Sequence, residues 1–233
     1  MINADDWGLN ARTTDNCFLC YERGGITSVS AMVFMDDSAR ASALALGARI
    51  PTGLHLNFTK GFDARGLPAA LNGHHQHVSS YLLKNRYAFL LYNPVLRNHF
   101  DYVYKAQVDE YVRLYGSIPN HIDGHHHMHL CMNLLIDGTI PRGSRVRRNF
   151  TFAPGEKSLL NRLYRSVIDT CLTRRYICTD YFFSLEPIAP GRLRHIMSLS
   201  RTANVELMVH PENKREYDYL LSSEYMSMIA DMK

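Results

Sequence analysis

The chain has 233 residues, of which 46% are hydrophobic and 21% are charged, a composition typical of a globular protein with a substantial core. Its formal net charge of +4 is small, and its one dense basic run, residues 142–148, lacks the wider stripe or fold motif of a nucleic-acid-binding protein, so we expect no nucleic-acid partner. No stretch is apolar for long enough to cross a membrane, and the N-terminus lacks the layout of a signal peptide, so we expect a cytoplasmic protein with no membrane partner.

The first quarter of the sequence predicts strands that alternate with helices. Apolar and β-branched runs indicate buried strands, and helical patterns bounded by an N-cap residue or by glycine indicate the helices between them. We expect strands over residues 1–4, 26–35 and 52–58 and helices over residues 11–23 and 36–49. The first strand is shorter than the roughly five residues usual for a buried strand, so we expect it to be truncated.

The five cysteines are odd in number and irregularly spaced. Cys17 and Cys20 form a CxxC pair, but no second pair follows at the spacing of a zinc ribbon, and the pair lies inside a predicted helix. We therefore interpret both as buried free thiols. Free thiols are typical of a reducing compartment, which again favours the cytoplasm.

The next part of the chain is irregular at first and then strongly helical. Residues 60–80 are rich in glycine, proline and histidine and predict a long loop that shapes a pocket. A helix is expected over residues 81–92. A stronger one is expected over residues 98–115, where apolar and aromatic residues recur on one helical face until Gly116.

Residues 121–129 concentrate Asp123 and five of the 12 histidines of the chain. Neutral imidazole is the commonest metal-binding side chain, and a nearby carboxylate can orient it, the role that we expect for Asp123. The spacing differs from that of a helical zinc site, and the pattern predicts the end of a strand entering a loop. Taken alone, the stretch leaves a metal site and a merely polar surface loop equally open. We expect substrate-facing, supporting or surface positions rather than metal ligation for His126, His127 and His129.

The remainder of the chain continues the alternation of strands and helices. We predict strands over residues 145–148, 181–184 and 205–211 and helices over residues 132–138, 156–174, 191–202 and 216–233. Strands that are apolar on both faces and separated by helices indicate a mostly parallel sheet in an α/β fold, either covered on both sides or closed into a barrel. No repeat or linker is visible, so we expect a single domain over residues 1–233.

Polar residues suited to metal chemistry lie at or near the ends of several predicted strands: Asp5, Asp6, His55, His125 and His210. Because the carboxyl ends of parallel strands meet at one rim, these side chains are expected to converge. Two imidazoles and one carboxylate hold a divalent ion with positions left open for water and substrate. A second carboxylate could accept the proton of the water, and His210 could donate one to a leaving amine.

Each of these residues also has an ordinary structural interpretation. The aspartate pair could belong to a turn before Gly8, His55 could be a core histidine, and His210 could merely end a strand before Pro211. A metal site is favoured because several independent coincidences would otherwise fall on the same edge of the sheet.

Four segments resemble motifs of the YdjC-like family, which includes the chitooligosaccharide deacetylase. They are residues 3–9, 52–57, 121–129 and 206–211, in family order and across almost the whole chain. The resemblance implies a deformed (β/α) TIM-like barrel. It also implies a metal-dependent hydrolase that removes acetyl groups from N-acetylated sugars or oligosaccharides.

The resemblance also implies roles for individual positions. Asp5 resembles the catalytic base, His210 resembles the proton donor, and Asp6, His55 and His125 resemble the metal ligands. The sequence departs from the family pattern at two positions, Trp7 and Glu212, where phenylalanine and glycine are usual. The first and last strands of the barrel are also expected to be truncated.

Three questions stay open at this point. The metal is Mg²⁺ or Zn²⁺ by resemblance, whereas two imidazoles and a carboxylate also suit Fe, Co, Mn or Ni. The substrate could be a non-sugar amide or ester, or the protein could be a silent sugar- or metal-binding relative. A homodimer is kept as a candidate assembly.

Overall fold

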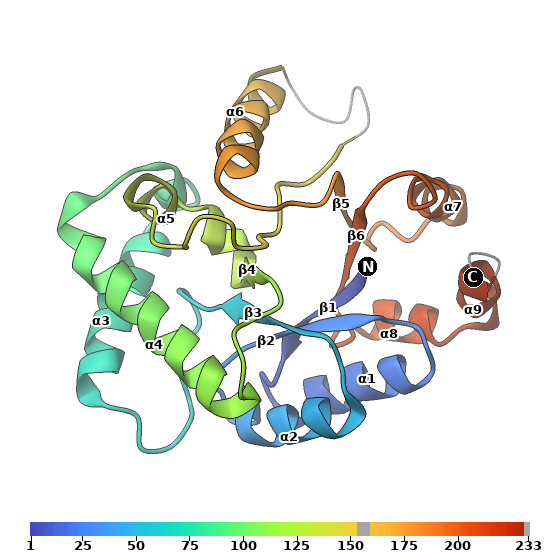
Figure 1. Ribbon diagram of the computed structural model, residues 1–233, viewed down its shortest axis with the longest axis horizontal. Coiled ribbons are helices and arrows are strands. Elements are labelled where there is room, and N and C mark those ends of the chain that lie inside the picture. Colours follow the sequence, from blue (N-terminus) through green and yellow to red (C-terminus); the bar gives the residue numbers. More distant parts are fainter. Residues whose placement is uncertain (153–158, 231–233) are drawn as a thin grey trace.

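A parallel sheet of six strands, in the order β4-β3-β2-β1-β6-β5, forms the centre of the computed structural model, which describes residues 1–152 and 159–230. The strands are β1 (Ile2–Trp7), β2 (Ser28–Ala31), β3 (Thr52–Leu56), β4 (Ile122–Gly124), β5 (Tyr181–Ser184) and β6 (Val205–Val209). The sheet curls into a half-barrel with helices around its outside (Figure 1). This confirms the predicted α/β architecture, a deformed TIM-like barrel.

Helices alternate with the strands along most of the chain. They are α1 (Ala11–Glu22), α2 (Ser38–Ala48), α3 (Ala69–Leu82), α4 (Arg97–Tyr115), α5 (Met132–Asp137), α6 (Leu159–Arg175), α7 (Pro190–Leu199), α8 (Lys214–Leu220) and α9 (Ser223–Ala230). Short 3₁₀ helices cover η1 (Ala88–Leu90), η2 (Pro94–Leu96) and η3 (His125–Leu130). Asn10 caps α1 by accepting a hydrogen bond from the Thr13 amide, as its residue type predicts.

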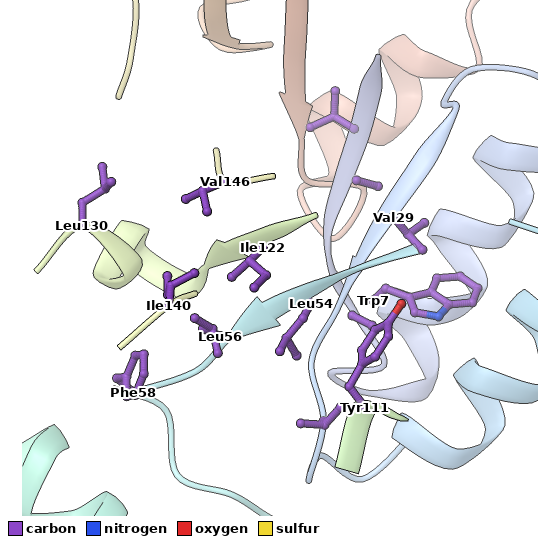
Figure 2. Close-up of a cluster of buried hydrophobic side chains, with 14 of the residues drawn as sticks. Trp7, Val29, Leu54, Leu56, Phe58, Tyr111, Ile122, Leu130, Ile140 and Val146 are labelled. Atoms are coloured by element: carbon purple, nitrogen blue, oxygen red, sulfur yellow. The ribbon is translucent and has the colours of Figure 1, made fainter. Parts of the chain in front are cut away.

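Apolar side chains fill the space between the outer face of the sheet and the helices. Side chains of β1, β2, β3 and β4 meet those of α4 in one cluster (Figure 2). Trp7 and Leu54 are fully buried there, and the Tyr111 hydroxyl donates to the Thr52 carbonyl oxygen at 2.8 Å. Burial of this apolar surface, worth about 25 cal/mol per Å², fixes α4 against β3.

The segment Arg145–Arg147 spans the gap between the two edges of the curled sheet. The predicted strand over residues 145–148 is present only as two isolated parallel bridges, of Val146 with Ile122 and of Arg145 with Ile177. The Arg147 amide donates to the Ile122 carbonyl at 3.0 Å, and the Val146 amide donates to the Ile177 carbonyl at 3.0 Å. Hydrogen bonds on both sides therefore hold this segment and place the Arg147 side chain inside the half-barrel.

The prediction of a truncated first strand was wrong. β1 spans six buried residues and includes both Asp5 and Asp6, whereas the sequence indicated only residues 1–4. The acidic pair does not end the strand, because the carboxylates find partners inside the half-barrel. Burial of a charged group is tolerated when it is paired and hydrogen-bonded.

The prediction for residues 60–92 was also wrong. Instead of a loop over residues 60–80 and a helix over residues 81–92, the structure has α3 over Ala69–Leu82, followed by η1 and η2. The buried residues of α3 are Leu71, His75, Val78 and Leu82. Their spacing of three or four residues is helical, and Gly73 and the histidines between them obscured that pattern.

Two smaller differences concern the last third of the chain. The helix predicted over residues 216–233 is divided into α8 and α9, which meet around Leu221. The start of the helix predicted over residues 156–174, and residues 231–233, lie outside the described residues.

Among the residues that are described, no helix has both the length and the apolar character that a membrane span requires.

Candidate metal centre

Both aspartates of β1 reach the same rim of the sheet because the strand is irregular there. Successive side chains of a regular strand point to opposite faces. The pairing of β1 with β2 shifts register between Ala4 and Trp7, and Asp6 has a φ of 63°, in the left-handed region. Such a conformation costs about 1–3 kcal/mol for a residue other than glycine, and such strain is found mainly at functional sites.

His55 on β3 lies between two carboxylates. Its Nε2 is 3.3 Å from Asp6 Oδ1, and its Nδ1 donates to Asp123 Oδ1 at 2.8 Å. The register of β3 with β4 pairs His55 directly with Asp123, so the contact follows from the sheet. Asp123 thereby aims the Nε2 atom of His55 at Asp6, which is the orienting role that the sequence predicted.

His125 completes the group at the end of β4. Its Nδ1 lies 2.9 Å from Asp6 Oδ1, and its ring centroid is 5.7 Å from that of His55. One ligand atom from each of Asp6, His55 and His125 lies within 4.8 Å of the others. A second such group, Asp5, His55 and Asp123, lies deeper and is fully buried.

The charges of the first group favour a cation. Burial works against the charge of Asp6, but the hydrogen bonds from His125 and His55 outweigh it and hold the pKa of Asp6 well below its usual range. Burial also works against a proton on His55, yet the negative charges of Asp123 and Asp5 raise the pKa of His55 to about 10. The pocket thus compensates its carboxylates with a proton on His55, and a divalent ion would displace that proton on binding.

The sequence analysis missed Arg147, which lies at the centre of the half-barrel. Its Nη1 and Nη2 atoms each donate to Asp5 at 2.7 Å, its Nε donates to Glu206 at 2.6 Å, and Nη2 lies 2.5 Å from Asp123 Oδ2. The Arg147 side chain is 0% exposed. One guanidinium therefore neutralises part of the charge of three buried carboxylates. The only sequence signal for it was the basic run over residues 142–148.

Small polar residues hold the carboxylates of the interior in place. Asn3 donates to Asp5 Oδ1 at 2.9 Å and to Ser30 Oγ at 2.8 Å, and Ser30 donates to Asp123 Oδ2 at 2.8 Å. The Ser30 hydroxyl also lies 2.9 Å from His121 Nε2. The ring of His121 fits because residue 53 is glycine, since a Cβ there would lie 2.4 Å from that ring.

His210 lies at the end of β6, on the same rim. Its Nε2 is 3.9 Å from Asp5 Oδ2, its Nδ1 is 3.9 Å from Glu216 Oε1, and its backbone amide donates to Glu216 at 2.7 Å. The side chain is 35% exposed, in contrast to the 2% of Asp5. The imidazole therefore lies between the buried carboxylate and solvent.

The other histidines of η3 belong to neither of the two converging groups. His126 is exposed and its Nδ1 lies 3.1 Å from Thr59 Oγ1, whereas His129 is buried and its Nε2 donates to the Arg147 carbonyl at 3.1 Å. The His127 ring packs against Phe150 at a centroid distance of 4.7 Å. His126 and His127 both have positive φ, which turns the chain sharply after the His125 ligand position.

Comparisons with known proteins agree with this architecture. A family model described as YdjC-like protein matches residues 1–231. A carbohydrate deacetylase of Vibrio parahaemolyticus is 28% identical over 217 residues, covering 91% of this chain and 77% of the relative. A chitooligosaccharide deacetylase of Serratia marcescens is 30% identical over 131 residues, covering 56% of this chain and 50% of the relative.

One solved structure has the same fold over the whole chain. It comes from Enterococcus faecalis V583 and is provisionally named a cellobiose-phosphate cleavage protein. Its TM-score is 0.68 at 17% identity, and the match covers 100% of this chain and 94% of the other. At this level of identity, the likeness concerns the fold alone.

Proposed function

This chain belongs to the YdjC-like family, and we propose on that basis that it is a metal-dependent hydrolase that removes acetyl groups from N-acetylated sugars or oligosaccharides. The observation that carries the proposal is the convergence of Asp6, His55 and His125 from three different strand ends. Relatives named carbohydrate deacetylase and chitooligosaccharide deacetylase support the class of reaction. The homodimer, the cytoplasmic location and the single domain over residues 1–233 stay predictions.

The donor set of this group fits a divalent ion. Asp6 would supply a carboxylate oxygen, and His55 and His125 would each supply an imidazole nitrogen, a combination that suits Zn²⁺ by ligand type, with Mg²⁺ as the alternative. When bound, the ion would supply Lewis acidity to the acetyl carbonyl and to the attacking water. Asp123 keeps the Nε2 atom of His55 turned toward Asp6.

Asp5 is the proposed proton acceptor. Hydrogen bonds from Asn3 and Arg147 fix its carboxylate, so its position is set before substrate arrives. It lies next to Asp6 in the chain and belongs to the second converging group with His55. A base in this position would take the proton of the attacking water without itself being a metal ligand.

His210 is the proposed proton donor to the leaving amine. Its imidazole lies 3.9 Å from Asp5 and is partly open to solvent, so both groups can face a substrate amide from the same side of the rim. Glu216 accepts a hydrogen bond from the His210 backbone amide and lies 3.9 Å from its Nδ1, which positions the ring from the other side. Base and acid would then both reach the same scissile bond.

The direct test is acetate release from N-acetylglucosamine oligomers, measured after chelation and after addition of Zn²⁺ or Mg²⁺. We expect activity that is lost with the chelator and restored by one of the ions. The Asp5→Asn variant should bind metal as the wild type does but release acetate at least 100-fold more slowly, because general base catalysis is worth about 10²–10⁴-fold.

A matched control is His195→Gln, which changes an exposed histidine on α7 and should leave the rate unchanged. Metal binding without acetate release from any oligomer would contradict the deacetylase proposal and favour a silent binding protein. Release from simple acetylated amides, but not from sugars, would favour a non-sugar amidase.

A further inference from the structure

Helix α3 packs against α4 at one side of the molecule (Figure 1). Three imidazoles that the proposed reaction does not use lie together at this contact. His74 and His77 belong to α3, and His99 belongs to the first turns of α4. The centroid of the His99 ring is 4.7 Å from that of His74 and 4.5 Å from that of His77. His99 is therefore close to both α3 histidines. The cluster shares no residue with the group of Asp6, His55 and His125, called the strand-end group from here on.

Two buried nitrogens of this cluster are not satisfied by the described part of the protein. The Nδ1 atoms of His74 and His99 are buried and have no hydrogen-bond partner among the described residues. The His74 ring stacks on Tyr102 at a centroid distance of 4.2 Å, a contact that offers its Nδ1 atom no hydrogen bond. His77 is exposed, so the cluster remains open to solvent on one side. Buried polar atoms without a partner are unfavourable unless a ligand or water pairs with them.

The cluster is also suited to cations by the chemistry of its side chains. A neutral imidazole keeps a lone pair available for a metal ion and is the commonest metal ligand in proteins. A proton on one ring of such a cluster disfavours protonation of the others, whereas one divalent ion can be shared by several imidazoles.

We propose that His74, His77 and His99 form a second metal site, which takes an imidazole-preferring divalent ion such as Zn²⁺, Ni²⁺ or Cu²⁺ between α3 and α4. Zinc–nitrogen bonds of about 2.0–2.1 Å place tetrahedral ligand nitrogens roughly 3.3 Å apart. The rings are already adjacent but do not yet converge their nitrogens, so binding requires them to turn about their side-chain bonds. Because the site offers no carboxylate, Mg²⁺ should not occupy it.

An ion in this position would cross-link α3 to α4. α3 also carries His75, whose ring is buried and packs against Phe62 at a centroid distance of 4.2 Å. Phe62 lies in the segment between β3 and α3, which also carries Thr59, the partner of His126 near the strand-end group. A metal between the helices would therefore steady the segment that borders the proposed active site.

The proposal is tested by counting Zn²⁺ bound per chain, by isothermal titration with the metal alone. We expect two ions for the wild type, one for His99→Gln, and one for a triple variant of the strand-end group, Asp6→Asn/His55→Gln/His125→Gln. Adding His99→Gln to the triple variant should remove the remaining ion. Mg²⁺ should fail to bind the triple variant, because only imidazoles remain.

The control is His195→Gln, which should still bind two ions. His77→Gln is a second test at an exposed position, where folding is least at risk, and should weaken the second site at least tenfold. The proposal is overturned if the triple variant binds no zinc, or if neither His99→Gln nor His77→Gln changes the binding curve. These outcomes do not depend on acetate release, so a failure of the deacetylase proposal would remain distinguishable.

Discussion

At the scale of single residues, the charge balance of the interior depends on Arg147. It is buried among Asp5, Asp123 and Glu206, and no other cation is within ion-pair distance of Glu206 among the described residues. We predict that Arg147→Met destabilises the protein by about 3–5 kcal/mol, because it leaves buried carboxylates unpaired.

Urea unfolding at pH 7 measures this effect. Arg113→Met is the matched control, because Arg113 pairs with Glu110 and its side chain is 65% exposed, and a surface ion pair is worth about 0–1 kcal/mol. An Arg147→Met variant as stable as the control would contradict the account of the interior given above.

A second residue-scale prediction concerns His75, which is buried against Phe62. Burial lowers the pKa of His75 from 6.5 to about 4. Because the folded-state pKa is depressed, its stabilising contribution is complete above pH 6.5 and is lost as the pH falls toward 4. Between pH 6.5 and 4, His75 binds a proton in the unfolded chain but not in the folded protein. The unfolding free energy should therefore decline by about 1.4 kcal/mol per pH unit for each such histidine.

The comparison is between urea unfolding curves of the wild type and His75→Gln at several pH values from 7.5 to 4.5. The variant should lose less stability over this range. The slope of its unfolding free energy against pH should be smaller by up to about 1.4 kcal/mol per pH unit, which corresponds to one proton. His195→Gln is again the control, because its ring is exposed. Parallel curves for wild type and His75→Gln would contradict the assignment of a neutral, buried His75.

The sequence predicted which residues would meet at the strand-end group but not what surrounds them. Asp6, His55 and His125 lie at or near the ends of predicted strands, and parallel topology alone brings such ends together. Arg147 could not be predicted in the same way, because its three partners come from β1, β4 and β6. Nothing in the local sequence around Arg147 distinguishes it from the neighbouring Arg145 and Arg148, and only the folded arrangement turns its side chain inward.

At the scale of elements, the contrast between α3 and α4 shows which helices can be recognised. α4 was predicted almost to the residue, because its buried residues recur regularly and Gly116, with a φ of 71°, ends it. The sequence of α3 predicts a loop because glycine and histidine interrupt a weaker apolar pattern. Packing against α4 stabilises the helix where intrinsic propensity does not.

Gly73 in α3 and Gly116 at the end of α4 allow a paired prediction. Gly73 lies inside α3, and a Cβ added there has nothing within 4 Å, so Gly73→Ala should stabilise the protein by about 0.5–1 kcal/mol. Gly116 has equally open surroundings but a left-handed conformation, so Gly116→Ala should destabilise it by about 1 kcal/mol.

Thermal unfolding of both variants provides the measurement, with each protein the control for the other. Opposite shifts in Tm are expected, because both substitutions add the same methyl group and differ in backbone conformation. A loss of stability in Gly73→Ala would indicate that residues 69–82 are not a continuous helix, as the sequence had suggested.

At the scale of the whole molecule, the alternation of strands and helices predicted the parallel α/β fold but not the content of its interior. The inside of a TIM barrel is usually packed with branched apolar side chains. Here Asn3, Ser30 and Asp123 line it with hydrogen bonds instead. This polar interior explains why the aspartates of β1 suggest the end of a strand. A polar residue that points into a barrel cannot be distinguished by sequence from one in a turn, unless its hydrogen-bond partners are known.

The stretch Arg145–Arg147 fastens one edge of the curled sheet to the other, and it also carries the guanidinium that the acidic residues share. The same three residues thus complete the backbone of the half-barrel and supply the positive charge of its interior. If this fastening were to loosen, the seam between β4 and the chain before β5 would open, and Asp5 and Asp123 would lose their common cation together. The backbone amides of Val146 and Arg147, which close that seam, would report both events through a single loss of protection against hydrogen exchange.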